Sequence, residues 1–417
     1  MEISYNLRYQ KFTFSNRVLI DKEGEIIIYD KGFRLKGKGA QDKGELINFS
    51  EIKEFYYKDE KVIFISFAKE KYVLSETSAM FEQMLKDLYK SRNEFLVDAL
   101  FMRSGKLKVE FEGKFERQSK FSKVINKGDA KMRLYENSLI IVPKILDAFS
   151  VNFNFISFYE FDELDYMLKI VMDDGQTIFI SNLGEYFEPF QEKMNEILQG
   201  MYGHLVNDNL RQVFPYFNIA TLLKLANKMK GGKSVSKKEI SKIDKELYQS
   251  IYEYIFDNDV IKEKFSYFLD IASDENIRMG LAKDDTVADT LIRWFMITIP
   301  EKNLVLFTVL NRWKQDSNKA DNHETYFYRI IMEKGRPEDK VNDKINEIDQ
   351  ALVNLNFVKD PCYKDKRELK HSPYQYAIRK MPFLRILRKS FMGTVSAVEV
   401  KDWHKQADEM IEKCALK

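Results

Sequence analysis

The residues best suited to chemistry are Gly231-Gly232-Lys233-Ser234, which match the end of a phosphate-binding loop. In such a loop the backbone N–H groups wrap nucleotide phosphates and the hydroxyl holds Mg²⁺. The loop also needs a glycine at position 227, where this chain has Asn227, and a buried strand before it. Because the preceding residues IATLLKLANKMK have helical spacing, the sequence predicts a glycine turn that ends one helix and leads to the next.

Other nucleophiles and metal ligands are few. They are Cys362, Cys414, His204, His323, His371 and His404. No two histidines have the HxxxH spacing of helix-borne zinc ligands, and Cys414 and His404 fall on different faces of a helix. The acidic pairs Asp173-Asp174 and Asp284-Asp285 could bind Mg²⁺ or transfer protons, but their turn and cap positions favour solvated carboxylates. We therefore expect no catalytic residue, no metal site and no cofactor, with a hydrolase site assembled from distant residues as the alternative.

A basic segment near the C-terminus is the candidate for binding an anion. From Lys364 to Lys389 the Lys and Arg residues far outnumber the two acids, and Tyr363, Tyr374, Tyr376 and Phe383 are interleaved among them. Cations neutralise phosphates and aromatic rings stack on bases, so this composition suits a nucleic acid. The predicted binding residues are Lys370, Arg379, Lys380, Arg385, Arg388 and Lys389. An acidic protein, an anionic membrane, or a solvated face whose leucines pack into the last domain are the alternatives.

Length and composition describe an ordinary globular chain. The 417 residues are 44% hydrophobic and 32% charged, and leave room for about three domains of ~150 residues. The 67 Lys and Arg nearly balance the 65 Asp and Glu, which argues against a protein built mainly to coat nucleic acid. The absence of a signal sequence, of an eighteen-residue apolar run and of a cysteine framework predicts a cytoplasmic protein without a transmembrane segment.

Two long segments of the first half resemble each other. Residues 27–37 align with residues 133–143 at an offset of 106, and residues 47–55 align with residues 151–159 at an offset of 104. The offset then returns to 106. Each copy has about seven short alternating or β-branched runs followed by one amphipathic helix. The apolar stripes of these two helices are Phe81, Leu85, Leu88 and Leu96, and Phe187, Phe190, Met194, Ile197 and Leu198.

This order of elements resembles the pleckstrin-homology (PH) superfold, in which a helix closes one end of a bent antiparallel barrel. Two such modules in tandem are similar to the double PH-like modules of some histone chaperones and to bacterial PH-like proteins. The resemblance implies an α+β fold with two tandem PH-like β-barrels, each closed by a C-terminal helix. Two unrelated small barrels or a pair of sandwiches are the alternatives. We expect modules at residues 1–103 and 104–205, a helical segment at 206–285 and a smaller α+β domain at 286–417.

The second half has a different pattern. Ser236 and Glu239 form a predicted capping box that opens one long helical run through Phe256. Strands are expected at residues 290–299, 302–313 and 324–333, and helices at residues 340–355 and 400–414. Three strands followed by a helix leave open a degenerate third copy of the module.

These patterns predict a non-enzymatic protein-binding scaffold that acts within a larger complex. Its partner would be another protein, through a strand added to a sheet edge. The first alternative is a nucleic-acid or chromatin-associated factor that uses the basic surface of residues 364–389. The second is PH-like binding to an anionic membrane. The cations available for it are Arg34, Lys36, Lys38, Lys114, Arg117, Lys120 and Lys123.

Overall fold

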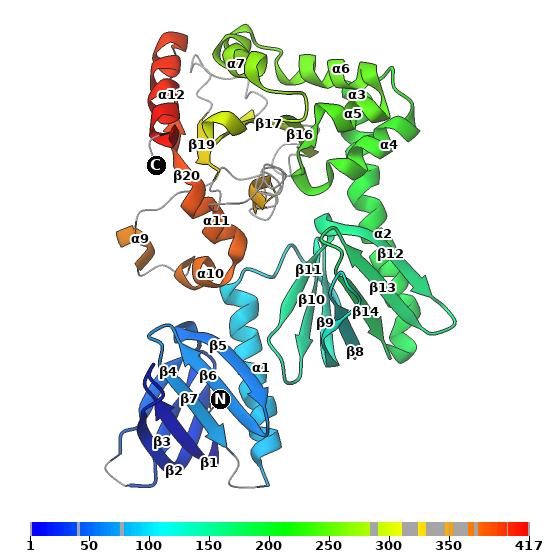
Figure 1. Ribbon diagram of the computed structural model, residues 1–417. Helices are drawn as coiled ribbons and strands as arrows, with labels where there is room; N and C mark the ends of the chain where they lie inside the picture. Colours follow the sequence, from blue (N-terminus) through cyan, green and yellow to red (C-terminus); the bar gives the residue numbers. More distant parts are fainter. Residues whose placement is uncertain are drawn as a thin grey trace. The chain divides into compact units, whose positions relative to one another are not determined.

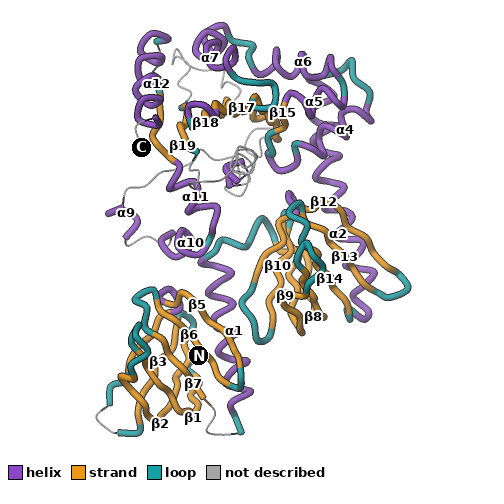
Figure 2. Tube along the Cα trace, viewed as in Figure 1, coloured by secondary structure: helices purple, strands orange, loops and turns teal. Residues whose placement is uncertain are grey.

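The computed structural model describes residues 2–39, 42–75, 79–283, 291–310, 324–330, 347–349, 351–352, 366–370, 374–397 and 399–415. The chain forms two compact units. Unit 1 comprises Met1–Ile197 together with Leu369–Lys380, and unit 2 comprises Leu198–Glu368 together with Met381–Lys417. Large antiparallel sheets and helices occur in a mixed α+β architecture, as Figures 1 and 2 show.

The first sheet of unit 1 has seven antiparallel strands in the order β4-β3-β2-β1-β7-β6-β5. The strands are β1 (Ile3–Phe12), β2 (Val18–Tyr29), β3 (Gly32–Gly37), β4 (Glu45–Asn48), β5 (Ile52–Lys58), β6 (Lys61–Ser66) and β7 (Lys71–Ser75). A short helical turn, η1 (Phe49–Glu51), joins β4 to β5. Helix α1 (Phe81–Ala99) packs its apolar stripe into the core that the alternating strand residues form, and Phe49, Phe64 and Leu88 are fully buried there.

The second sheet of unit 1 has the corresponding order, β11-β10-β9-β8-β14-β13-β12. Its strands are β8 (Leu107–Gln118), β9 (Val124–Tyr135), β10 (Ser138–Pro143), β11 (Phe149–Asn152), β12 (Ile156–Asp162), β13 (Met167–Met172) and β14 (Thr177–Ser181). The turns η2 (Phe153–Phe155) and η3 (Gly184–Tyr186) follow β11 and β14, and α2 (Phe187–His204) ends the series.

Equivalent elements of the two sheets begin at the offsets seen in the sequence. Strand β9 begins 124 − 18 = 106 residues after β2, β11 begins 149 − 45 = 104 residues after β4, and α2 begins 187 − 81 = 106 residues after α1. Phe49 and Phe153, which the alignment pairs, are both fully buried.

Unit 2 opens with helical elements. They are η4 (Leu205–Leu210), α3 (Arg211–Val213), α4 (Ile219–Lys228), η5 (Lys230–Gly232), α5 (Lys237–Ile243), α6 (Lys245–Ile255) and α7 (Asp259–Ile271). Gly231 has a φ of 60°, so the Gly-Gly-Lys-Ser segment is the predicted turn after a helix. The Ser236–Glu239 capping box is present. The prediction of one long helix from Glu239 to Phe256 was wrong, because two helices, α5 and α6, occupy this range. Asp244 divides them: its backbone is extended, and its carboxylate accepts hydrogen bonds from the first turn of α6.

The third sheet has six strands that pair in chain order, from β15 to β20. They are β15 (Val235–Ser236), β16 (Ile277–Lys283), β17 (Leu291–Ile299), β18 (Leu304–Leu310), β19 (Thr325–Arg329) and β20 (Phe391–Val395). The turn η6 (Pro300–Lys302) joins β17 to β18. Every residue of β17 and β18 is buried. This meander differs from the strand order of the first two sheets.

Helices α7 and α12 (Val400–Ala415) share a core with this sheet. Phe265 packs against Phe295 of β17 and Trp403 of α12, with ring centroids 4.6 and 4.8 Å apart. The remaining described helices are α9 (Lys366–Lys370), α10 (Tyr374–Lys380) and α11 (Pro382–Ser390). Of the helix expected at residues 340–355, the described residues 347–349 and 351–352 are helical and the others lie outside the described part. No helix in the described ranges is long and apolar enough to cross a membrane.

Candidate functional site

Three consecutive side chains of α1 bind the second sheet of unit 1, and we name this set of contacts the inter-sheet joint. Arg92 is fully buried, and its Nε and Nη2 donate to the two carboxylate oxygens of Asp147 at 2.7 and 2.8 Å. Its guanidinium also lies 4.6 Å from the ring centroid of Phe55 in the first sheet. Burial opposes the charge of Arg92, but Asp147 outweighs this effect and raises the pKa of Arg92.

The next residue, Asn93, is also fully buried, and its side chain hydrogen-bonds to the end of β10 and to the loop between β10 and β11. Its amide nitrogen donates to the carbonyls of Pro143 and Leu146 at 2.9 and 3.0 Å. Its amide oxygen accepts from the backbone N–H of Ala148 at 2.8 Å. A satisfied buried amide of this kind specifies one position of the loop, because any shift would leave polar groups unpaired.

Glu94 completes the joint through Arg133 of β9. The Arg133 Nη2 lies 2.5 Å from Glu94, and its Nε lies 2.7 Å from Glu110 of β8. Hydrogen bonds from Arg133 to these carboxylates raise the pKa of Arg133. Charged and polar contacts therefore hold α1, which packs on the first sheet, to β9, to the end of β10 and to the loop that follows β10.

Helix α10, which is distant in sequence, belongs to the same unit. Tyr376 and Ala377 are buried, and the Tyr376 ring lies 5.1 Å from that of Phe95 and 6.3 Å from that of Phe67. Burial raises the pKa of Tyr376 to about 12, against the opposing charge of Arg92. The Lys380 ammonium donates to the backbone carbonyl of Lys53, and burial followed by the charge of Arg92 lowers its pKa.

The six residues predicted to bind an anion fall on three helices. Lys370 ends α9, Arg379 and Lys380 end α10, and Arg385, Arg388 and Lys389 are on α11. The Arg379 guanidinium lies 4.7 Å from the centroid of the Phe67 ring. Arg385 and Lys389 are exposed and Arg388 is half-buried. The spacing of these three residues places them on one face of α11. Lys370, Arg379 and Lys380 belong to unit 1, and Arg385, Arg388 and Lys389 belong to unit 2.

One aromatic residue of the basic segment was misassigned. Tyr376 was expected to be available for stacking on a base, but it is 4% exposed because it packs against Phe67 and Phe95. Tyr374 is 45% exposed and its ring stacks on that of Phe101 at 5.4 Å. Tyr363 and the acidic pair Asp284-Asp285 lie outside the described residues.

The joint itself was missed by sequence reasoning, although a signal for Arg92 exists. The apolar stripe of α1 runs through Leu85, Leu88 and Leu96, and Arg92 lies four residues from each of the last two. A charged residue at a core-facing position of an amphipathic helix indicates a buried partner. The identity of that partner, Asp147, had no signal in the sequence.

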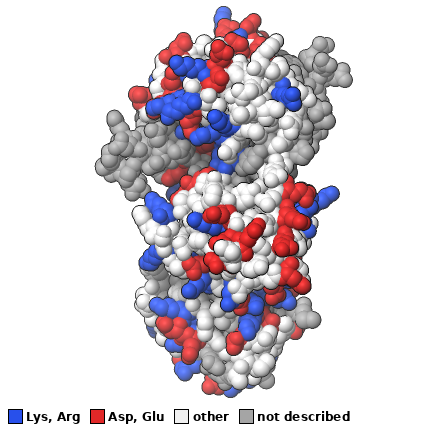
Figure 3. Space-filling view, turned by 90° about the vertical axis from the view of Figure 1, so that its right-hand side faces the viewer, with Lys and Arg blue, Asp and Glu red and all other residues white. Residues whose placement is uncertain are grey.

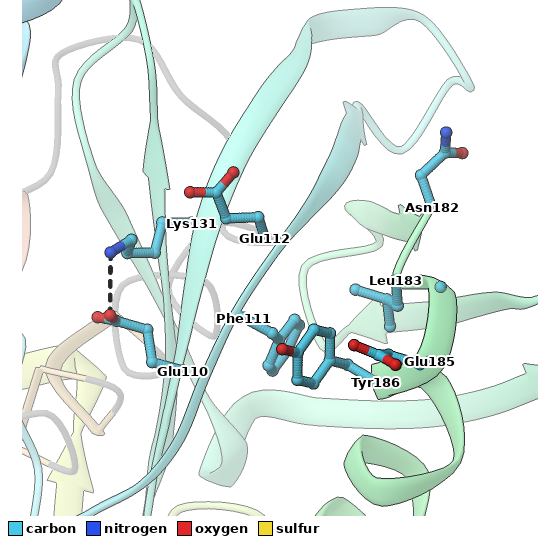
Figure 4. A pocket seen from close by; sticks show the side chains of 9 residues that line it. Glu110, Phe111, Glu112, Lys131, Asn182, Leu183, Glu185 and Tyr186 are labelled. Atoms are coloured by element: carbon cyan, nitrogen blue, oxygen red, sulfur yellow. Dashed lines mark hydrogen bonds and ion pairs between the residues drawn. The ribbon is translucent and has the colours of Figure 1, made fainter.

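The surface of unit 1 also has a hollow of about 580 Å³ between β8 and η3. Figure 4 shows Glu110 joined to Lys131, and Phe111 and Tyr186 are among the other residues that line the hollow. Burial opposes ionisation of Glu110, but hydrogen bonds from Lys131 and Arg133 lower its pKa. A lowered pKa is the opposite of what a general acid requires. Among the described residues, no group of three His, Cys, Asp or Glu side chains converges as metal ligands would.

Charged side chains of both signs are interspersed on the face of the molecule in Figure 3.

No protein-family model and no curated protein matches the chain. Solved structures do match, among them one described as the structure of the Spt16D Pob3N heterodimer. That match has 12% sequence identity and a TM-score of 0.16, and covers 42% of this chain and 86% of the other. At this TM-score the likeness carries no weight for fold or function.

Proposed function

We propose that the protein is a non-enzymatic scaffold whose N-terminal half is a rigid platform for binding another protein. The observation that carries this proposal is the inter-sheet joint. Arg92 and Asn93 are fully buried and make charged or amide hydrogen bonds to Asp147 and to the loop around it. Such contacts hold two sheets in one arrangement, which a platform requires and two loosely linked domains would lack.

The two sheets with their closing helices are, in this proposal, tandem PH-like modules at residues 1–103 and 104–205. The support is that seven antiparallel strands and one helix occur twice, in the same strand order. The equivalent elements also start at the two offsets that the sequence alignment predicts. The modules would bind protein partners through sheet edges or the surfaces beside the closing helix.

Strand β12 is a candidate edge for such a partner. It is the last strand of its sheet and pairs only with β13 in the described residues. Phe158 on this strand is 51% exposed. An edge strand offers unpaired backbone groups, and an exposed aromatic side chain beside them adds apolar contact area.

The test is affinity purification of the tagged full chain from its native lysate, with and without nuclease. We expect a stoichiometric protein partner that survives nuclease, and loss of that partner when Phe158 is replaced by Lys if β12 is the edge it uses. Tyr166→Lys is the matched control, because Tyr166 is similarly exposed but lies in the turn after β12. Recovery of no stoichiometric protein would contradict the scaffold.

A second candidate function is binding of an anionic polymer by α11, favoured by the exposure of Arg385 and Lys389 on one helix face. It predicts that affinity for a nucleic acid falls steeply with salt. Replacing both residues, Arg385→Gln with Lys389→Gln, should lower the salt slope by about 2, one unit for each phosphate that the variant no longer neutralises. Equal slopes for the variant and the wild type would remove this candidate.

Membrane binding has less support. Two of its proposed cations, Lys36 and Lys38, form ion pairs with Glu25 and Glu23 at 3.5 and 2.6 Å. Arg117 donates to Gln176 at 2.8 Å and lies over the ring of Phe149. Cations engaged in this way are less available to lipid head groups.

A further inference from the structure

The turn between β12 and β13, residues 163–166, is longer than its counterpart in the first sheet. It has four residues, whereas the turn between β5 and β6, residues 59–60, has two. The Asp162 carboxylate accepts hydrogen bonds from the backbone N–H groups of Leu164 and Asp165 at 2.9 and 3.1 Å, which fixes the turn locally. The Leu164 side chain is 91% exposed. The longer turn therefore presents to solvent an apolar side chain that the sheet does not use for its core.

Acidic residues flank this leucine. Glu163 and Asp165 are both exposed, and residues 148–168 contain four acids and no Lys or Arg. The next cation along the chain, Lys169, lies on β13 and not in the turn. We name Glu163, Leu164 and Asp165 the acidic turn. It combines one exposed apolar side chain with two negative charges.

Helix α4 in unit 2 carries exposed apolar residues of its own. Ile219 and Leu223 are one helical turn apart and both are exposed, although the helix has a separate buried face. Tyr216, in the loop just before the helix, is 97% exposed. We name Tyr216, Ile219, Leu223 and the exposed Lys224 the α4 face. Single exposed apolar side chains are ordinary, but three within eight residues form a candidate binding surface.

The charge around the α4 face is positive. Residues 209–238 contain seven Lys and Arg and no Asp or Glu. Acids of other segments pair with Lys228, Lys237 and Lys238, whereas Lys224 is exposed on the face itself. An apolar surface with a cation at its border is complementary to an apolar side chain flanked by carboxylates.

We propose that the acidic turn of one copy of this chain docks on the α4 face of a second copy. Tyr216 and Leu164 are the two most exposed large apolar side chains among the described residues, and they lie on segments of opposite charge. In the proposed contact, Leu164 of one copy packs on the apolar side chains of the α4 face of the other. The carboxylates beside it lie near Lys224. Complementary charge and complementary apolar surface thus identify the occupant.

The two surfaces of this contact are different, and every copy carries both. The acidic turn of one copy binds the next copy, whose own acidic turn remains available, so the contact is heterologous. Assembly then continues beyond two copies unless it closes into a ring. A copy that lacks one of the two surfaces can still bind through the other, which gives a specific expectation for mixed variants.

Analytical ultracentrifugation of the purified full chain over a series of concentrations measures this assembly. We expect the average mass of the wild type to rise above that of one chain as the concentration increases. Leu164→Ser and Leu223→Ser should each weaken association at least about tenfold, because each removes a leucine from the contact. Leu46→Ser and Ile271→Ser are the controls, since they remove exposed apolar side chains of β4 and α7 that lie outside both surfaces.

A mixture of the two weakened variants tests the pairing directly. The Leu164→Ser copy keeps its α4 face, and the Leu223→Ser copy keeps its acidic turn. An equimolar mixture should therefore form pairs with one copy of each variant and nothing larger. Circular dichroism of each variant alone shows whether it is folded, and a mixture of folded variants that forms no pairs while the wild type assembles would contradict the proposal.

Glu163→Gln combined with Asp165→Asn tests the contribution of charge. This variant should associate more weakly than the wild type and with less dependence on salt, because salt screens the attraction between exposed charges. A wild type that sediments as one chain at every concentration would overturn the proposal and leave an acidic segment of another protein as the occupant. Assembly that Leu164→Ser leaves unchanged would overturn it as well. The purified chain is used alone, so neither outcome depends on the scaffold function.

Discussion

At the scale of single residues, the most informative position is Arg92. It lies where α1 should continue its apolar stripe, yet it is charged and fully buried. Its stability there depends on Asp147, which supplies both oxygens of a bidentate ion pair. The surface pair Arg8 and Asp21 has nearly the same geometry, at 2.8 and 2.9 Å, but is solvated. Because the two ion pairs have similar distances, a difference in how much each contributes to stability reports the burial of the arginine rather than the hydrogen-bond geometry.

We predict that Asp147→Asn lowers the free energy of unfolding of unit 1 by about 3 kcal/mol, because it leaves a buried guanidinium without its charge partner. Chemical denaturation followed by circular dichroism measures the change. Asp21→Asn, the solvated control, should leave the midpoint unchanged within error. Equal effects of the two substitutions would show that burial of Arg92 does not matter.

A buried carboxyl, that of Asp349, lies in unit 2. Its oxygen accepts a hydrogen bond from the Ser234 hydroxyl at 2.7 Å. Burial raises the pKa of Asp349, despite this hydrogen bond and the nearby charges of Arg278 and Lys233. The serine of the Gly-Gly-Lys-Ser segment thus holds a buried acid of its own chain.

The raised pKa has a definite consequence for stability. A carboxyl whose pKa is higher when folded contributes stability that is fully present below its ordinary value of 3.8 and is lost as pH rises through the folded pKa. We therefore predict that the wild type loses stability relative to Asp349→Asn as pH rises from below 3.8 towards neutrality. Urea unfolding of both proteins across this range measures the difference, and parallel curves would contradict the prediction.

At the scale of elements, close approach of backbone and ring explains a glycine in β16. Gly280 pairs with Trp294 of β17, and a Cβ at Gly280 would lie 2.1 Å from atoms of the buried indole. A strand position that tolerates no side chain on this face must remain glycine, because neither the ring nor the paired backbone can move away.

Gly280→Ala should therefore destabilise unit 2 by about 3 kcal/mol, the upper end for overpacking a core. Thermal unfolding followed by tryptophan fluorescence measures the change. Gly203→Ala is the control of opposite sign, since nothing lies within 4 Å of an added Cβ in α2, and it should raise stability by up to about 1 kcal/mol. A neutral Gly280→Ala would show that β16 and β17 can separate at little cost.

At the scale of the whole molecule, the two units are not successive in the sequence. The chain passes from unit 1 into unit 2 after Ile197, and residues 369–380 then belong to unit 1 again. The opening of α10 should therefore follow the stability of unit 1 rather than that of unit 2, to which the next helix, α11, belongs.

Hydrogen exchange of the α10 amides tests this membership. Asp147→Asn should speed their exchange, because it loosens the joint on which α10 sits. Gly280→Ala should leave them unchanged, although it destabilises the unit to which the next helix, α11, belongs. If the α10 amides respond to Gly280→Ala instead, α10 belongs to unit 2.

Much of the element content could be predicted from the sequence alone. Alternation of apolar residues placed the strands, the Ser236–Glu239 pair marked the start of α5, and the glycines after α4 marked a turn. These are local signals, since strand pleat, helix caps and positive φ depend on residues within a few positions of one another. Even so, the cap at Asp244 was overlooked, so one long helix was expected where α5 and α6 lie.

Only the tertiary structure decided which side chains that are distant in the sequence contact one another. Asp147 meets Arg92 from 55 residues away. Tyr376 is buried against the ring of Phe95 in α1 and the ring of Phe67, which follows β6 of the first sheet. The basic residues from Arg379 to Lys389 divide between two units. Such long-range contacts produce no periodic pattern in the sequence. The packing of whole helices and strands decides which side chains meet, and the spacing of residues within one element does not reveal it.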